Sequence, residues 1–164
     1  MRYMVLDIDI DKNLEVKKPT MACYLPDNSV EIDIKRTHKT IVICPGGAYM
    51  MTSDREAEPI ALKFLSAGFN CFVLRYSVDP VSFPTSLLEL SKAVAIIREN
   101  AQEWNVDVND ITVCGFSAGG HLAASLATMW NRDFIMQKLG IEYGQNKPNK
   151  VILGYPVISS GEYA

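Results

Sequence analysis

The stretch ITVCGFSAGGHLAASLA, residues 111–127, decides the fold of this chain. Its first four residues are apolar or β-branched, and such a short run predicts a strand that is buried on both faces. From residue 118 onward, apolar residues recur at three- and four-residue steps, which predicts a helix over 118–129. Only a few small residues separate the two elements, so the strand must turn almost directly into the helix.

This tight turn predicts a reactive serine. It has the pattern Gly-x-Ser-x-Gly, with Ser117 at its centre, between a strand and a helix, which is typical of a nucleophile elbow. Gly115 and Gly119 would let strand and helix approach closely. The turn would lift the Ser117 hydroxyl above the sheet and aim the Ala118 N–H, at the positive end of the helix, toward a developing oxyanion. The alternative is a structural serine in a glycine-rich turn.

A second glycine loop follows another predicted strand. CPGGAYM, at 44–50, comes after the apolar run at 41–44 and precedes a predicted helix. Esterase oxyanion holes need one N–H donor from such a loop besides the donor next to the nucleophile. Alone, the loop would be an ordinary turn. Paired with the elbow, it predicts an oxyanion hole formed by Gly46, Gly47 and Ala118.

Two aromatic residues beside these turns are candidates for lining a substrate pocket. Tyr49 lies in the glycine loop and Phe116 directly precedes Ser117. A packed loop aromatic is an equally good interpretation of Tyr49. The loop lacks the lysine and the spacing of a phosphate-binding P-loop, so its glycines do not predict a nucleotide. No metal or organic cofactor is implied.

The remaining sequence alternates predicted strands and helices. Further buried strands are expected at 71–76 and 151–155, and helices at 54–67, which Gly68 would end, and at 86–102. This order predicts a parallel sheet with helices on both faces, in which ligands bind at the carboxyl ends of the strands.

An antiparallel ribbon is expected before that sheet. The opening residues alternate apolar and acidic side chains from Tyr3 to Asp11, as in an edge strand, and a second strand is predicted at 21–25. Alternating Val30, Ile32 and Ile34 predict a further strand after a turn.

Composition limits the other function classes. The 164 residues are 48% hydrophobic, enough for one core and one domain, 1–164. A net charge of -3 without a basic stripe makes nucleic acid an unfavoured partner. The N-terminus lacks a secretory signal and no apolar run reaches the roughly 18 residues of a membrane span, so we expect a cytoplasmic protein without a membrane partner. The four cysteines are expected to be free thiols in the core.

Together these segments resemble the α/β-hydrolase serine esterases, in particular the acetylxylan-esterase-like carbohydrate esterases related to the hormone-sensitive-lipase type. The resemblance runs through VICPGGAY, AEPIALKFLSAGFNCFVLRYSV, GFSAGGHLAASLA and VILGYPVIS. It implies a three-layer α/β-hydrolase fold, a mostly parallel sheet with N-terminal antiparallel strands. It also implies Ser117 as the nucleophile, Gly46 and Gly47 in the oxyanion hole, and a small ester such as an acetylated sugar as substrate. Pro45 replaces the leading histidine of the HGGG loop of hormone-sensitive-lipase relatives, which is not the catalytic base.

The resemblance also implies what this chain lacks. In the family, strands seven and eight deliver the catalytic aspartate and histidine, and this sequence ends at Ala164, after the sixth predicted strand. We therefore expect the N-terminal part of a single α/β-hydrolase domain that is weakly active or inactive alone. Of the two histidines, His38 is expected in a solvated loop at the amino end of the sheet. His121 is expected to pack and hydrogen-bond beneath the glycine loop, not to act as the base.

Three functions follow from this sequence. The first is a carboxylic-ester hydrolase that forms an acyl-enzyme on Ser117. The second is a non-catalytic module, or one half of a two-chain enzyme or homo-oligomer that pairs through the exposed edge of the sixth strand. The third is a serine peptidase of related fold, for which no peptide-binding feature is visible. Asp79 and Glu89, near predicted strand ends, have no histidine to orient.

Overall fold

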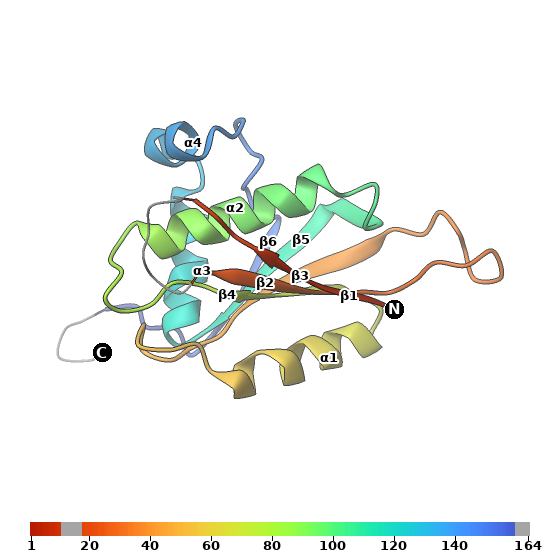
Figure 1. Cartoon of the computed structure of the whole chain (residues 1–164), viewed down its shortest axis with the longest axis horizontal. Coiled ribbons are helices and arrows are strands. Elements are labelled where there is room, and N and C mark those ends of the chain that lie inside the picture. Colours follow the sequence, from red (N-terminus) through yellow and green to blue (C-terminus); the bar gives the residue numbers. More distant parts are fainter. Residues whose placement is uncertain (11–17, 160–164) are drawn as a thin grey trace.

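The structure is a computed structural model that describes residues 1–10 and 18–159. These residues form one six-stranded sheet in the order β1-β2-β4-β3-β5-β6 (Figure 1). The strands are β1 (Arg2–Asp7), β2 (Thr20–Leu25), β3 (His38–Cys44), β4 (Asn70–Arg75), β5 (Val106–Phe116) and β6 (Lys150–Gly154). β1 pairs antiparallel with β2 and β2 antiparallel with β4, whereas the other pairs are parallel. The predicted mostly parallel sheet with antiparallel N-terminal strands is confirmed.

Helices cover both faces of the sheet. They are the 3-10 turn η1 (Asp54–Glu56) and the helices α1 (Glu58–Ser66), α2 (Thr85–Glu99), α3 (Ala118–Met129) and α4 (Asp133–Leu139). α1 lies on one face and α2 on the other (Figure 1). α3 and α4 share the hydrophobic core of α2. The arrangement therefore has three layers, helix, sheet and helix, as predicted.

The central strands are buried on both faces because their alternate side chains enter two separate cores. Val42 and Phe72 belong to the core shared with α2 and α3. Their neighbours Ile43 and Cys71 belong to the core beneath α1. Since successive side chains of a strand point to opposite faces, this is why the runs are apolar without alternation. All four cysteines are free and buried, as predicted.

The strand predicted around Val30, Ile32 and Ile34 is wrong. The three side chains are 88%, 68% and 56% exposed and belong to no strand. The backbone forms local hydrogen bonds with side chains instead. The Ile32 N–H donates to the Ser29 hydroxyl, and the Lys35 N–H donates to the Asp33 carboxylate. Such turns compete with strand pairing. The ribbon consists of β1 and β2 alone, and Asp11, the last residue of the predicted opening strand, lies outside the described residues.

Two further expectations need correction, and one helix was missed. His38 is not a solvated loop residue: it begins β3, is 3% exposed, and its ring nitrogens lie 3.0 Å from the Gly68 carbonyl and 2.9 Å from Asn28 Oδ1. The helix predicted over 54–67 is divided at Ala57, whose backbone leaves the helical region just before Pro59. α4 was not predicted at all. None of the described helices is long and apolar enough to cross a bilayer.

Candidate active site

The turn between β5 and α3 has the backbone expected of an elbow. Ser117 has φ 51° and ψ −118°, in a region that a residue with a side chain rarely adopts. Such a conformation costs about 1–3 kcal/mol and persists only where the surroundings hold it. Here the Ser117 N–H donates to the Gly154 carbonyl at 3.0 Å, and the Ser117 carbonyl accepts from the Val157 N–H at 3.2 Å. The side chain is only half-buried, so the serine is not a packed core residue.

The glycines around Ser117 are required by close backbone contacts. A Cβ atom on Gly115 would lie 2.0 Å from the Gly119 carbonyl oxygen, and one on Gly119 would lie 2.0 Å from the Cys44 carbonyl oxygen. Both distances are far below van der Waals contact. Both positions must therefore be small, Gly115 because β5 approaches α3 and Gly119 because α3 approaches the end of β3.

The glycine loop after β3 lies beside the elbow. A Cβ atom on Gly46 would lie 3.0 Å from Ser117 Cβ, which places this turn next to the serine. Gly47 has φ 139°, and Ala48 and Tyr49 have φ 55° and 56°, so three successive residues of the loop have positive φ. The Gly46 N–H is already bonded, since it donates to Glu56 Oε2 at 2.7 Å. The structure thus brings Gly46 and Ser117 together, with one N–H of the turn held by a carboxylate.

Tyr49 joins this loop to α3. Its hydroxyl lies 2.8 Å from Nδ1 of His121, and the two rings pack edge to face with centroids 5.8 Å apart. Burial raises the pKa of the Tyr49 hydroxyl to about 12. The hydrogen-bonding part expected of His121 is therefore observed, although its side chain is exposed.

Two pockets open on either side of the Tyr49–His121 pair. One, of about 660 Å³, is lined by that pair together with Ala118, Val157 and Ile158. The other, of about 550 Å³, is lined by the pair together with the apolar side chains Val81, Phe83, Leu87 and Leu122. Phe116 packs its ring against Tyr155, with centroids 5.9 Å apart. Tyr49 thus faces pockets at the carboxyl end of the sheet, where ligands of such folds bind.

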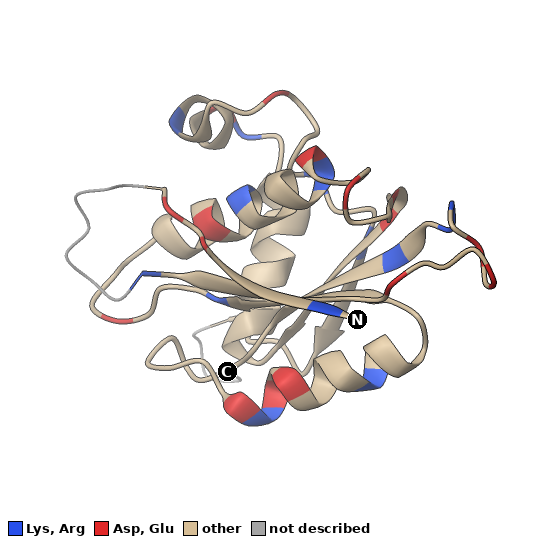
Figure 2. Ribbon diagram, turned by 45° about the vertical axis from the view of Figure 1, so that its right-hand side comes forward, with Lys and Arg blue, Asp and Glu red and all other residues tan. Residues whose placement is uncertain are grey.

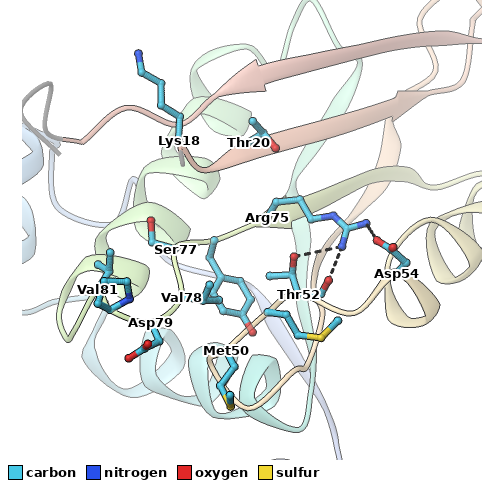
Figure 3. Close-up of a pocket in the computed structure, with 13 residues that line it drawn as sticks. Lys18, Thr20, Met50, Thr52, Asp54, Arg75, Ser77, Val78, Asp79 and Val81 are labelled. Carbon is cyan, nitrogen blue, oxygen red and sulfur yellow. Dashed lines mark hydrogen bonds and ion pairs between the residues drawn. The ribbon is translucent and has the colours of Figure 1, made fainter. Parts of the chain in front are cut away.

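A third pocket, of about 630 Å³, lies beyond the glycine loop, at the end of β4 (Figure 3). Arg75, the last residue of β4, donates to the Thr52 carbonyl at 2.9 Å and to Asp54 Oδ1 at 2.8 Å. The loop that follows the glycines is therefore anchored to the sheet. In Figure 2 the Lys and Arg residues are scattered over several elements, among Asp and Glu residues.

Comparison with known proteins assigns the chain to a family. The model of the BD-FAE family matches residues 21–157. The chain belongs to the BD-FAE family. Endo-1,4-beta-xylanase B of Butyrivibrio fibrisolvens is 36% identical over 151 residues, 88% of this chain and 22% of that protein. The Acetylxylan esterase of Xylanibacter ruminicola is 32% identical over 146 residues, 88% of this chain and 26% of that protein.

Solved structures agree with this BD-FAE assignment. MGS-M1, an alpha/beta hydrolase enzyme from a Medee basin deep-sea metagenome library, is 38% identical with a TM-score of 0.78. An acetyl ester-xyloside bifunctional hydrolase from Caldicellulosiruptor lactoaceticus is 31% identical with a TM-score of 0.81. In each case 98% of this chain covers 60% of the other. The predicted α/β-hydrolase fold is confirmed, and this BD-FAE chain spans about a quarter of its curated relatives and 60% of these solved chains.

Sequence reasoning missed one side chain that contacts the glycine loop of this BD-FAE site. Glu56, in η1, accepts from the Gly46 N–H through Oε2 and from the Tyr155 hydroxyl through Oε1, both at 2.7 Å. Its contacts come from segments ten and 99 residues away. The sequence held one indication, since Glu56 follows the glycine loop within one short segment. The direction of its side chain, however, cannot be predicted from the sequence.

Glu89, one of the two acids noted near predicted strand ends, bonds to Ser77 and not to a histidine. It is fully buried in α2 and accepts from the Ser77 N–H at 2.6 Å and from the Ser77 hydroxyl at 2.5 Å. Burial raises the pKa of this carboxyl, and the two bonds from Ser77 partly oppose the shift.

Asp79 borders two of the pockets, and its N–H donates to the Tyr49 carbonyl at 2.7 Å. Among the described residues of this BD-FAE chain, no group of three or more His, Cys, Asp or Glu side chains could hold a metal ion.

Proposed function

We propose that this chain is the N-terminal part of a single α/β-hydrolase domain and carries the nucleophile of a carboxylic-ester hydrolase. The observation that carries the proposal is the strained backbone of Ser117, with φ 51°, next to the turn of Gly46. Strain of this kind is characteristic of functional sites and lifts the hydroxyl above the sheet. The names of the relatives, acetylxylan esterase and acetyl ester-xyloside hydrolase, support an ester substrate.

The proposed reaction proceeds through an acyl-enzyme. Ser117 Oγ bonds to the carbonyl carbon of the ester, and its proton passes to a base. The tetrahedral oxyanion then collapses, the bond from the carbonyl carbon to the alcohol oxygen breaks, and the base returns the proton to the leaving alcohol. Water repeats the sequence and releases the acid and the free serine. In the proposed triad the base is a histidine that an acidic side chain orients.

The proposed oxyanion hole uses Gly46, Gly47 and Ala118 in different ways. The Ala118 N–H stands at the first position of α3, where the helix dipole favours a negative charge. The Gly46 N–H donates to Glu56, so we assign the second donor to the Gly47 N–H. Gly46 contributes its lack of a side chain, since a Cβ there would meet both Glu56 and the Phe116 carbonyl at 2.8 Å.

We propose an acetylated sugar as the substrate class, on the strength of the relatives' names alone. The test is release of acetate from an acetylated xylo-oligosaccharide by the complete enzyme, meaning the polypeptide that also carries the triad acid and base. A fluorophosphonate probe should label Ser117 in that enzyme, as read by mass spectrometry of its peptides. Equal labelling of the Ser117→Ala variant would refute the nucleophile.

A second candidate function is one half of a two-chain assembly. In the part of the chain that the structure describes, β6 lies at the edge of the sheet and exposes Ile152 and Leu153 by 44% and 42%. An apolar edge of this kind is a template for pairing with another strand. Sedimentation velocity at rising protein concentration tests pairing between copies of this chain, because Leu153→Lys should lower any self-association, and a monomer at all concentrations would exclude that pairing.

A further inference from the structure

We propose that Glu56 is a positioning residue for the oxyanion-hole turn, an inference that rests on the proposed function. The two oxygens of its carboxylate accept hydrogen bonds from two different segments, the Gly46 N–H after β3 and the Tyr155 hydroxyl after β6, each at 2.7 Å. The side chain is half-buried and both of its oxygens are occupied. One carboxylate therefore joins the two loops that flank the elbow.

Both segments also lie against Ser117, one through a hydrogen bond and the other through close approach. The Gly154 carbonyl accepts from the Ser117 N–H at 3.0 Å, and Gly154 directly precedes Tyr155. On the other side, Gly46 approaches so closely that a Cβ atom would lie 3.0 Å from Ser117 Cβ. A closed path thus runs from Ser117 through Gly154, Tyr155 and Glu56 to Gly46 and back to the serine. The separation between the hydroxyl and the neighbouring Gly47 N–H depends on this path.

Glu56 can hold the turn because its own element is anchored. η1 begins at Asp54, which accepts from Arg75 of β4 at 2.8 Å (Figure 3). The Ser53 N–H just before it donates to the Gly46 carbonyl at 2.8 Å. The segment from Ser53 to Glu56 therefore hydrogen-bonds both the N–H and the carbonyl of Gly46, and it is itself bonded to the sheet through Asp54. A group held in this way can place a donor within the tolerance that catalysis needs.

The role is geometric and not electrostatic. A negative charge beside a developing oxyanion would oppose its formation, so the charge of Glu56 cannot be the useful property. The turn needs a side chain that is long enough to reach Gly46 and that carries a hydrogen-bond acceptor. Glutamine supplies one: its amide oxygen can accept from Gly46 while its NH2 group donates to the Tyr155 oxygen. Glu56→Gln should therefore preserve the function, whereas Glu56→Ala should not.

The hydrogen bond between Gly46 and Glu56 is tested on the 164-residue chain by amide hydrogen exchange, measured by NMR. Exchange at the Gly46 N–H should become about 10-fold faster or more in Glu56→Ala and stay near the parent rate in Glu56→Gln. Glu58→Gln is the matched control, because Glu58 lies two residues on and accepts from Tyr24 on the sheet instead. Unchanged Gly46 exchange in Glu56→Ala would overturn the proposal. Should that variant not fold, Glu56→Asp, one methylene too short for the bridge, takes its place with the same expectation.

The catalytic consequence is tested in the complete enzyme. Glu56→Ala should lower kcat and the rate of fluorophosphonate labelling by about 10-fold or more with KM little changed, since one oxyanion donor alone can be worth about 100-fold. Glu56→Gln should retain the parent values, a rescue that a charge effect would not give. If the probe labelled the parent enzyme no faster than the Ser117→Ala variant, the proposed function would be refuted. If it labelled Ser117 at the parent rate in Glu56→Ala, only the positioning role would be refuted.

Discussion

The hydroxyl of Tyr49 and Nδ1 of His121 lie 2.8 Å apart, linking the glycine loop to α3 one helical turn beyond Ser117. His121 is the only histidine at this end of the sheet among the described residues, since His38 begins β3 at the opposite end. Because its Nδ1 is bonded to the loop, His121 supports the wall between two pockets. The contact gives His121 a scaffolding role, and among the described residues no hydrogen bond joins its ring to the Ser117 hydroxyl.

We predict that His121→Ala leaves Ser117 functional. The loss of an exposed hydrogen bond should lower the free energy of unfolding by about 0.5–1.5 kcal/mol, and labelling of Ser117 in the complete enzyme should slow by less than about 10-fold. Urea unfolding and labelling kinetics measure the two effects. Tyr49→Phe, which removes the same bond from the other side and keeps the ring packing, should give a similar loss of stability. A loss of labelling of about 1000-fold in His121→Ala alone, on the order expected for removal of a catalytic base, would contradict this view.

We also predict that the elbow does not tolerate one added methyl group. In Gly119→Ala the new Cβ would lie 2.0 Å from the Cys44 carbonyl oxygen and 2.5 Å from the Pro45 carbonyl oxygen, so strand and helix must separate. The free energy of unfolding should fall by at least about 3 kcal/mol, as measured by urea denaturation. Gly144→Ala is the control, because that glycine has φ 84° but nothing within 4 Å of an added Cβ. Its cost should be limited to about 1–2 kcal/mol of backbone strain, and equal losses in the two variants would show that close approach is unimportant.

The buried carboxyl of Glu89 predicts a pH dependence of stability. Burial raises its pKa in the folded protein above the ordinary value of 4.5. Between the unfolded and folded pKa values, the unfolded chain has released a proton that the folded chain still holds, so stability falls as pH rises. The contribution of Glu89 is fully present below about pH 4.5 and is lost as pH rises through the folded pKa.

Glu89→Gln should remove this dependence. The stability difference between the parent chain and the variant should shift in favour of the variant as pH rises from about 4 to about 8, in urea unfolding at each pH. Glu99→Gln, at the exposed end of α2, should follow the parent curve. Parallel curves for the parent and Glu89→Gln would mean that Glu89 binds its proton equally in both states.

The sequence predicted the elements whose cause is local. The turn at Ser117 could be anticipated because two glycines and a serine at fixed spacing, between a strand and a helix, leave few other structures. Ser117 and Gly46 could be expected to meet because parallel strands end at one edge of the sheet.

The features that could not be predicted depend on contacts between distant segments. Nothing near His38 reveals that Asn28 and Gly68 will enclose it, and nothing near Glu56 reveals that Tyr155 will approach. The alternation of Val30, Ile32 and Ile34 was misleading. β2 already pairs with β1 on one side and β4 on the other, so it had no free edge to which this segment could pair.

The chain by itself should be a poor esterase. Its two histidines are His38, buried at the amino end of β3, and His121, bonded to Tyr49, and in the described part of the chain neither forms a hydrogen bond with the Ser117 hydroxyl. A nucleophile without a base retains only the effect of the oxyanion hole and of binding. The purified 164-residue chain should therefore hydrolyse p-nitrophenyl acetate little faster than its Ser117→Ala variant, and at least about 1000-fold more slowly than the complete enzyme. If the chain turned over the ester rapidly, and both Ser117→Ala and His121→Ala abolished that turnover, His121 would be the base.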